Sequence, residues 1–140
     1  MKNSIIIIIT MFLVLFGTSP LQAQDFNPKK HHYLVLSQNI EQLKPFLLTA
    51  NALAEADGKK YGDFYVIICG KTVRDIVNNP NFNTLLEDAK NQKVKVFVCG
   101  LSLKKFNIDP NLLPSNITVV DNGILYGFQL QKKGFLSLTI

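Results

Sequence analysis

"VKVFVCGLSL", residues 94–103, is an apolar run that ends in a cysteine and turns at a glycine. Earlier in the chain, "FYVIICGKTV", residues 64–73, repeats the same pattern. Near-continuous apolar runs of this length are typical of strands that are covered on both faces. Each run leads into a segment with helical features, and strands that alternate with helices predict a parallel sheet with right-handed crossovers. These two stretches therefore predict an α/β fold.

The remaining sequence extends this alternation to five strands. Further strands are predicted at residues 31–38, 116–122 and 134–140, where β-branched and apolar residues lie between turn signals. The spacing of apolar residues predicts helices that end at Gly58 and that cover 81–92 and 123–133, with short helical pieces or loops at 71–77, 100–108 and 109–114. We expect one three-layer α/β domain over residues 31–140, with a mostly parallel five-stranded sheet and helices on both faces.

Residues 1–23 have the three parts of a secretory signal peptide. Lys2 gives a positive start, residues 5–16 are uncharged and apolar, and small or turn-forming residues precede a cut after Ala23. The apolar run has about 12 residues, whereas a helix that spans a bilayer needs roughly 20. A retained anchor is the alternative. We expect an exported, periplasmic protein without stable membrane insertion, beginning with a flexible lead-in over residues 24–30; N-terminal sequencing of exported protein would test this.

The charge pattern argues against a nucleic-acid partner. The formal net charge is +5 for 140 residues, and the lysines occur as scattered doublets. Such doublets are typical of a solvated surface rather than of one basic face. The mature length suits a single domain with one core.

Two motifs suggest ligands but do not fulfil the requirements for them. "CGKT" at residues 69–72 resembles part of a phosphate loop, yet the full pattern needs a glycine five residues before Gly70, where the chain has Tyr65. His31 and His32 precede the first strand, without a cysteine or carboxylate at ligand spacing. We expect them to be surface histidines at the amino end of the sheet, and we expect no metal site and no cofactor.

The two cysteines, Cys69 and Cys99, follow the second and third strands. The carboxyl ends of parallel strands form the ligand-binding edge of such sheets, so both lie where function is expected. A thiolate at a helix start is stabilised by free backbone N–H groups. Gly70 and Gly100 allow tight turns there, and Ser102 offers a hydroxyl donor. Small buried core residues are the alternative for both cysteines. Nearby lysines would add positive charge: Lys71, Lys104 and Lys105.

We expect that the two cysteines do not form a stable disulfide in the resting protein. A flavodoxin-like strand order places the second and third strands on either side of the first. Two strand spacings are roughly 10 Å, beyond the limit of about 7 Å between the Cα atoms of a disulfide. A disulfide-switched protein is a further alternative, which requires the two residues to meet.

The segment "VFVCGLSLKKFNIDPNLLPSNITVVDNGILYGFQLQKKGF", residues 96–135, contains a series of short motifs in a characteristic order. They are the strand-ending Cys99, Ser102-Leu103, "LLP", the strand "ITVV", Asn122-Gly123, a helix with glutamines, and Gly134-Phe135. In this order and spacing the chain resembles the DsrE family of sulfur-relay proteins, in particular its small exported single-domain branch, over about residues 33–135. The resemblance implies a DsrE-like fold and matches Cys99 to the cysteine that carries a persulfide.

The chain departs from the family pattern at two places. Cys69-Gly70 stands where relatives of this branch commonly have His-Gly, which removes a possible base. Gly100 and Leu101 stand where family members often have an asparagine.

The resemblance implies a sulfur-handling or thiol-redox protein in which Cys99 accepts or carries sulfur as a persulfide. The expected partners are a sulfur donor or acceptor protein or a small sulfur compound. Apolar C-terminal segments indicate a homo-oligomer. A trimer is the form that the resemblance to the DsrE fold favours. The alternative is a non-catalytic, small-ligand-binding oligomeric module in which Cys99 only packs. The sequence leaves open whether the protein is an enzyme. The expected site residues around Cys99 are Cys69, Gly70, Lys71, Gly100 and Ser102.

Overall fold

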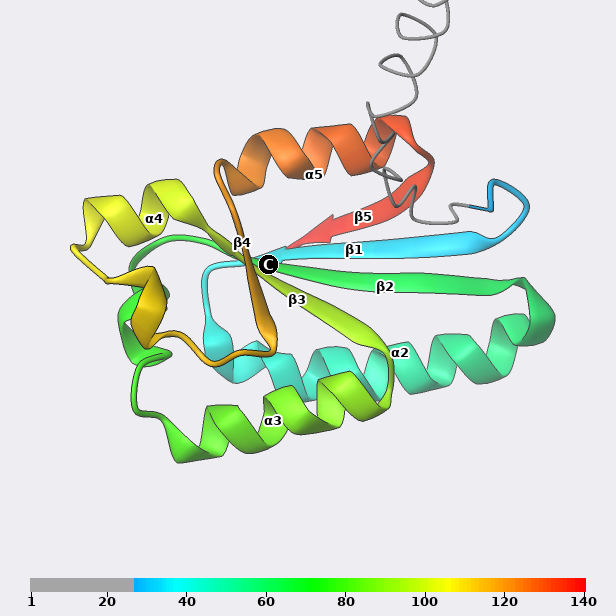
Figure 1. The fold of residues 1–140 in the computed structure, drawn as a ribbon. Helices are drawn as coiled ribbons and strands as arrows, with labels where there is room; N and C mark the ends of the chain where they lie inside the picture. Colours follow the sequence, from blue (N-terminus) through cyan, green and yellow to red (C-terminus); the bar gives the residue numbers. More distant parts are fainter. Residues whose placement is uncertain (1–26) are drawn as a thin grey trace, which may run out of the picture.

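The computed structural model describes residues 27–140, and the predicted signal peptide lies outside them. Five parallel strands form one sheet in the order β4-β3-β2-β1-β5. The predicted α/β fold with a parallel five-stranded sheet is therefore confirmed (Figure 1). The strands are β1 (His31–Ser37), β2 (Tyr61–Ile68), β3 (Val94–Cys99), β4 (Ile117–Val120) and β5 (Phe135–Thr139).

The helices lie on both faces of this sheet. Figure 1 shows α2 (Leu43–Asp57) and α3 (Pro80–Asn91) together on one face and α5 (Gly123–Lys132) on the other. The short α4 (Gly100–Lys105) follows β3 beyond the carboxyl end of the sheet. No helix within residues 27–140 is long and apolar enough to cross a membrane. The 3-10 segments are η1 (Ile40–Gln42), η2 (Gly58–Lys60), η3 (Lys71–Asp75) and η4 (Pro110–Leu112).

The predicted flavodoxin-like strand order is wrong. β2 pairs with β1 on one side and with β3 on the other, so the second and third strands are neighbours. The chain adds β2, β3 and β4 successively in one direction, and only the connection through α5 returns to the free side of β1. Strands that follow each other in sequence are usually neighbours in a sheet, and the first three connections follow this rule.

Local sequence signals explain where the helices begin and end. The Asn79 side chain accepts a hydrogen bond from the backbone N–H of Phe82 and caps α3, with Pro80 in its first turn. Asn122 caps α5 in the same way, accepting from Ile124 and Leu125. Gly58 ends α2 with a φ of 53°, as its position in the sequence predicted.

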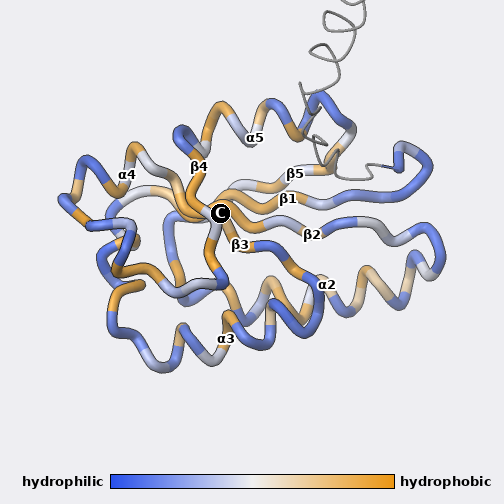
Figure 2. The backbone as a smooth tube through the Cα atoms, in the orientation of Figure 1, coloured by the Kyte–Doolittle hydropathy of each residue, from blue (hydrophilic) through white to orange (hydrophobic). Residues whose placement is uncertain are grey.

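The sheet divides the core into two parts. Residues 64–68 of β2 are all buried, as expected for a central strand covered on both faces. Figure 2 shows the apolar residues concentrated along the strands and the hydrophilic residues in the outer turns. The larger part lies between the sheet and the α2/α3 pair. The smaller part, under α5, consists of Leu34, Tyr65, Ile67, Cys69, Phe97, Cys99, Leu130 and Phe135.

His32 is not the surface histidine that the sequence predicted. It is 2% exposed, because strand alternation directs it to the α5 face, where its ring lies 5.0 Å from that of Phe135. Its Nε2 donates to the carbonyl oxygen of Asn27 at 2.9 Å, and its Nδ1 lies 2.9 Å from an Asp63 carboxylate oxygen. His31 is half exposed, as predicted, and lies 3.0 Å from Asp57.

The two glycines of α5 differ in how closely they approach the sheet. A Cβ on Gly123 would lie 2.8 Å from Sγ of Cys69 and 3.0 Å from Cβ of Cys99, which are distances that real Cβ atoms avoid. A Cβ on Gly127, one turn later, would meet nothing closer than 3.9 Å. Only the first glycine is therefore required by close packing.

This contrast predicts opposite effects of two matched substitutions. Gly127→Ala should raise the free energy of unfolding by about 0.5–1 kcal/mol, because alanine favours the helix and fits the space. Gly123→Ala should lower it by about 1–3 kcal/mol, because the new methyl group overpacks the two cysteines. Urea denaturation measures both, and equal effects of the two substitutions would contradict the packing described.

Candidate functional site

The sheet register places the two cysteines side by side. Ile68 of β2 pairs with Val98 of β3, so Cys69 and Cys99 are the next residues along two adjacent strands. Adjacent strands lie about 4.8 Å apart, not the two spacings that the expected strand order implied. Both cysteines are free thiols in the structure, but the distance argument that predicted this was wrong.

Hydrogen-bond donors surround the sulfur of Cys99. The backbone N–H of Gly123 donates to Sγ at 3.2 Å. Burial alone would raise the pKa of Cys99, but it is outweighed by hydrogen bonds from the N–H groups of Gly123, Ser102 and Leu101 and from the Ser102 hydroxyl. The pKa therefore lies below its ordinary value of 9.0, and the thiolate is the favoured form over a wider pH range.

The pKa of the neighbouring Cys69 is shifted in the opposite direction. Burial, the negative charge of Cys99 and a hydrogen bond to Cys99 together raise the pKa of Cys69 to about 12. The proton thus stays on Cys69, which donates to the Cys99 thiolate. When Cys99 is ionised, the pair therefore holds one proton and one negative charge, an arrangement typical of a nucleophile with a protonated partner.

Ser102 connects the two turns that follow the strands. Its hydroxyl oxygen accepts a hydrogen bond of 2.9 Å from the N–H of Gly70, which leaves the hydroxyl proton available for Cys99. Gly70 has a φ of 78°, in the left-handed region that favours glycine. A Cβ on Gly100 would lie 3.1 Å from the carbonyl oxygen of Val120, so this position also needs a small residue.

Most of the residues predicted for the site therefore lie together, and the lysines do not. Cys69, Gly70, Gly100 and Ser102 join Cys99, whereas Lys71 is exposed. The contributions that lower the pKa of Cys99 come from backbone and hydroxyl donors, not from lysines. Lys104 and Lys105 are exposed too, and Lys105 lies 5.8 Å from the ring of Phe106.

Sequence analysis missed the role of Gly123. The signal was the Asn-Gly pair ahead of the last helix, which indicates a capped helix start. It did not indicate that this helix start would lie on the sulfur atoms of two other strands, because that contact joins residues 24 positions apart.

The thiol pair is enclosed. Cys69 is 7% exposed and Cys99 is 4% exposed. Direct reaction at this depth favours small reagents, and burial shields a bound sulfur atom from bulk thiols. Within residues 27–140, no three histidine, cysteine, aspartate or glutamate side chains lie together so that they could hold a metal ion.

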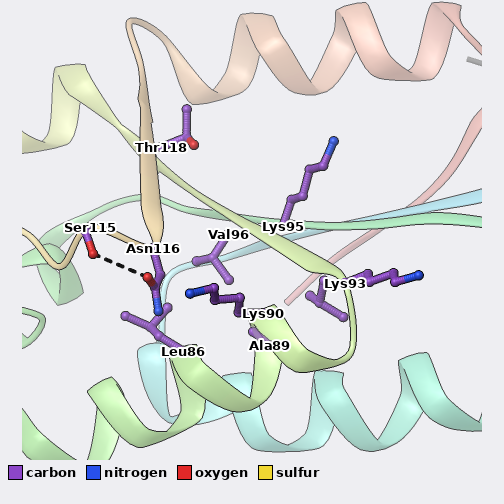
Figure 3. Close-up of a pocket in the computed structure, with 10 residues that line it drawn as sticks. Leu86, Ala89, Lys90, Lys93, Lys95, Val96, Ser115, Asn116 and Thr118 are labelled. Atoms are coloured by element: carbon purple, nitrogen blue, oxygen red, sulfur yellow. Dashed lines mark hydrogen bonds between the residues drawn. The ribbon is translucent and has the colours of Figure 1, made fainter. Parts of the chain in front are cut away.

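A separate groove of about 520 Å³ lies along the outer edge of β3, between the end of α3 and the start of β4 (Figure 3). Figure 3 shows Lys93 and Lys95 extending away from the strand, and Lys95 donates to the Tyr65 hydroxyl at 3.2 Å. The groove lies at the amino-terminal residues of β3, whereas Cys99 is the last residue of that strand. Its lysines therefore do not contribute to the thiol site.

Solved structures similar to this chain share its fold. The MTH1491 protein of unknown function from Methanobacterium thermoautotrophicum is 14% identical with a TM-score of 0.61, covering 79% of this chain and 99% of its own. The ychN protein from E. coli is 20% identical with a TM-score of 0.56, covering 78% and 99%. BT1422, a conserved protein of unknown function from Bacteroides thetaiotaomicron, is 18% identical with a TM-score of 0.55, covering 77% and 94%.

No curated protein matches the sequence. The sequence model of the DsrE/DsrF-like family matches residues 33–138. This range includes all five strands except His31 and His32 of β1 and Thr139 of β5. The chain therefore belongs to the DsrE/DsrF-like family, as the order of its C-terminal motifs predicted.

Proposed function

We propose that this protein handles sulfur and that Cys99 accepts and carries it as a persulfide. The observation that supports this most is the thiol of Cys99, held among several hydrogen-bond donors beside a protonated second thiol. Family membership makes a role related to sulfur relay plausible. The thiolate would attack the terminal sulfur of a donor persulfide, R–S–SH. This forms Cys99–S–SH and releases the donor as the thiolate RS⁻.

The same donors suit the product as well as the reactant. Negative charge on a persulfide lies on its outer sulfur, and N–H groups at a helix start stabilise negative charge. The first N–H group of α5 donates to Sγ of Cys99, which would be the inner sulfur of the persulfide, and the outer sulfur would be bonded to that atom beside the same helix start. The enclosed position would then extend the lifetime of the bound sulfur. A small sulfur compound fits the access better than a bulky donor, unless the Asn122-Gly123 turn moves.

The second candidate is a small-ligand-binding oligomeric module in which Cys99 only packs. The observation that favours it is a cavity of about 250 Å³ between α5 and β5, lined mainly by apolar residues. Its walls include Leu36, Phe128 and Leu138. Thiol reactivity discriminates between the two candidates, because a purely structural cysteine would not label readily at neutral pH.

We also propose that the protein is exported to the periplasm and forms a homo-oligomer, with a trimer favoured. The export signal lies outside the described residues. Oligomerisation is supported by apolar side chains on α5 and β5 that are each more than half exposed: Ile124, Leu125, Phe128, Leu136 and Leu138. Exposed apolar patches of this kind usually mark contacts between chains.

The pKa directions predict how alkylation depends on pH. Iodoacetamide should modify Cys99 at a rate that rises with pH and has its midpoint below 9.0, because only the thiolate reacts. Cys69, with a pKa of about 12, should remain unmodified over that range. Mass mapping of alkylated peptides between pH 5 and 10 distinguishes the two. A midpoint for Cys99 at or above 9.0, in a Cys69→Ala background, would show that the donors do not activate it.

Persulfide loading tests the proposed function directly. In samples quenched with acid immediately after treatment with inorganic polysulfide, the intact mass of the wild-type protein should be higher by one sulfur atom. Cys99→Ser should abolish loading, because the acceptor is lost. Cys69→Ser should only weaken it, because serine keeps a hydrogen-bond donor at that position. Equal loading of Cys99→Ser and wild-type protein would contradict the proposal that Cys99 is the sulfur acceptor.

The oligomer is tested by light scattering at micromolar concentration. Phe128→Glu should shift the wild-type oligomer toward monomer, because it puts a charge into the apolar contact. Leu48→Glu is the matched control, since Leu48 is exposed to a similar extent (65% against 59% for Phe128) but lies on α2. A wild-type monomer would refute the proposal, as would equal dissociation by both substitutions.

A further inference from the structure

The geometry of the two cysteines allows them to form a bond without movement of the strands. They follow a cross-strand pair in register, so their Cα atoms are separated by about one strand spacing of 4.8 Å. Disulfides have Cα separations of about 4.4–6.8 Å. Both side chains point to the α5 face, where they belong to the same buried cluster.

Both cysteines pack against the same point at the start of α5. Gly123 lies so close that an added Cβ would be 2.8 Å from Sγ of Cys69 and 3.0 Å from Cβ of Cys99. Cys69 already hydrogen-bonds to Cys99 as a protonated thiol. Thiol–disulfide exchange needs a second thiol close to the sulfur that is attacked, and Cys69 satisfies this condition.

We propose that Cys69 is a resolving cysteine that displaces the outer sulfur from a persulfide on Cys99. This inference rests on the proposed function, since it needs sulfur to be loaded on Cys99. Sγ of Cys69 attacks Sγ of Cys99, the bond between the two protein sulfurs forms, and the S–SH bond breaks. The overall step is Cys99–S–SH + Cys69–SH → Cys99–S–S–Cys69 + H₂S, and the proton of Cys69 leaves with the sulfide.

The electrons in this step balance within the protein. The outer sulfur is reduced to sulfide, and the two cysteines are oxidised to a disulfide. A dithiol reductant then restores the two thiols by exchange and becomes a disulfide itself. The activity that results is reduction of sulfane sulfur to sulfide, which differs from handing an intact persulfide to a partner.

The change in charge on loading fits this order of events. While Cys99 is a thiolate, its charge helps to keep the proton on Cys69, which suppresses premature reaction. Once Cys99 carries the extra sulfur, any negative charge moves to the outer sulfur atom and away from Sγ of Cys99, so that contribution weakens and Cys69 ionises more readily. Hydrogen sulfide is small enough to leave a site whose cysteines are each less than a tenth exposed.

The test uses the mature protein loaded with inorganic polysulfide and then desalted. Wild-type protein should release one sulfide for each persulfide and finish as an intramolecular disulfide, seen by intact mass and peptide mapping. Cys69→Ser and Cys69→Ala should both keep the persulfide, with sulfide release slower by about tenfold or more. Using two substitutions separates loss of the thiol from a packing effect, and circular dichroism checks that both variants fold.

The outcomes distinguish this inference from the proposed function. A wild-type persulfide that persists as long as that of Cys69→Ala overturns the resolving role and leaves the carrier role intact. Absence of loading in wild-type protein and in both Cys69 variants overturns the carrier role. The geometry has its own test, because diamide should link Cys69 to Cys99 in unloaded wild-type protein. Failure to form that disulfide overturns the resolving role whatever the result of loading.

Discussion

The parallel register between β2 and β3 is the constraint on which the thiol site depends. It aligns the last residues of two buried strands, so both sulfur atoms appear at one point of the sheet edge. A shift of one residue in either strand would turn one sulfur to the α2/α3 face, because side chains alternate along a strand. Both strands are buried where they pair, so the position of the two sulfur atoms depends on the core rather than on the loops of the site.

The α5 helix completes the surroundings of the two cysteines. Without α5, Cys99 would keep the donors of α4 but lose the N–H group of Gly123, and both cysteines would lie on an uncovered face of the sheet. The helix contributes an N–H group aimed at Cys99 and excludes side-chain bulk at Gly123. Asn122 fixes the helix start through two hydrogen bonds, so the donor is held by the cap rather than by the thiolate itself. The donors are thus in place before negative charge develops.

Much of the fold follows from local sequence patterns, whereas the arrangement of the strands does not. Apolar runs, Gly58 and the Asn-Pro pair at 79–80 predict the strands and helix boundaries, because these signals act over a few residues. Strand order depends on which side of a strand each crossover returns to, and neither flavodoxin-like nor sequential order leaves a local signal. The burial of His32 also escaped prediction, since it depends on pairing with Phe135 and on Asn27. For the same reason, the sequence placed Cys69 and Cys99 at the ends of two separate strands, and only the structure shows that these strand ends are neighbours.

His32 also determines where the chain enters the domain. Its hydrogen bond to the carbonyl oxygen of Asn27 fixes the lead-in at the amino end of β1. The thiol pair lies at the carboxyl end of the sheet, about 20 Å away for a strand of this length. Any segment that precedes Asn27 therefore starts from the end of the molecule remote from the sulfur atoms. Attaching the domain to a surface through that segment would leave the reactive edge pointing outward, free to meet molecules in solution.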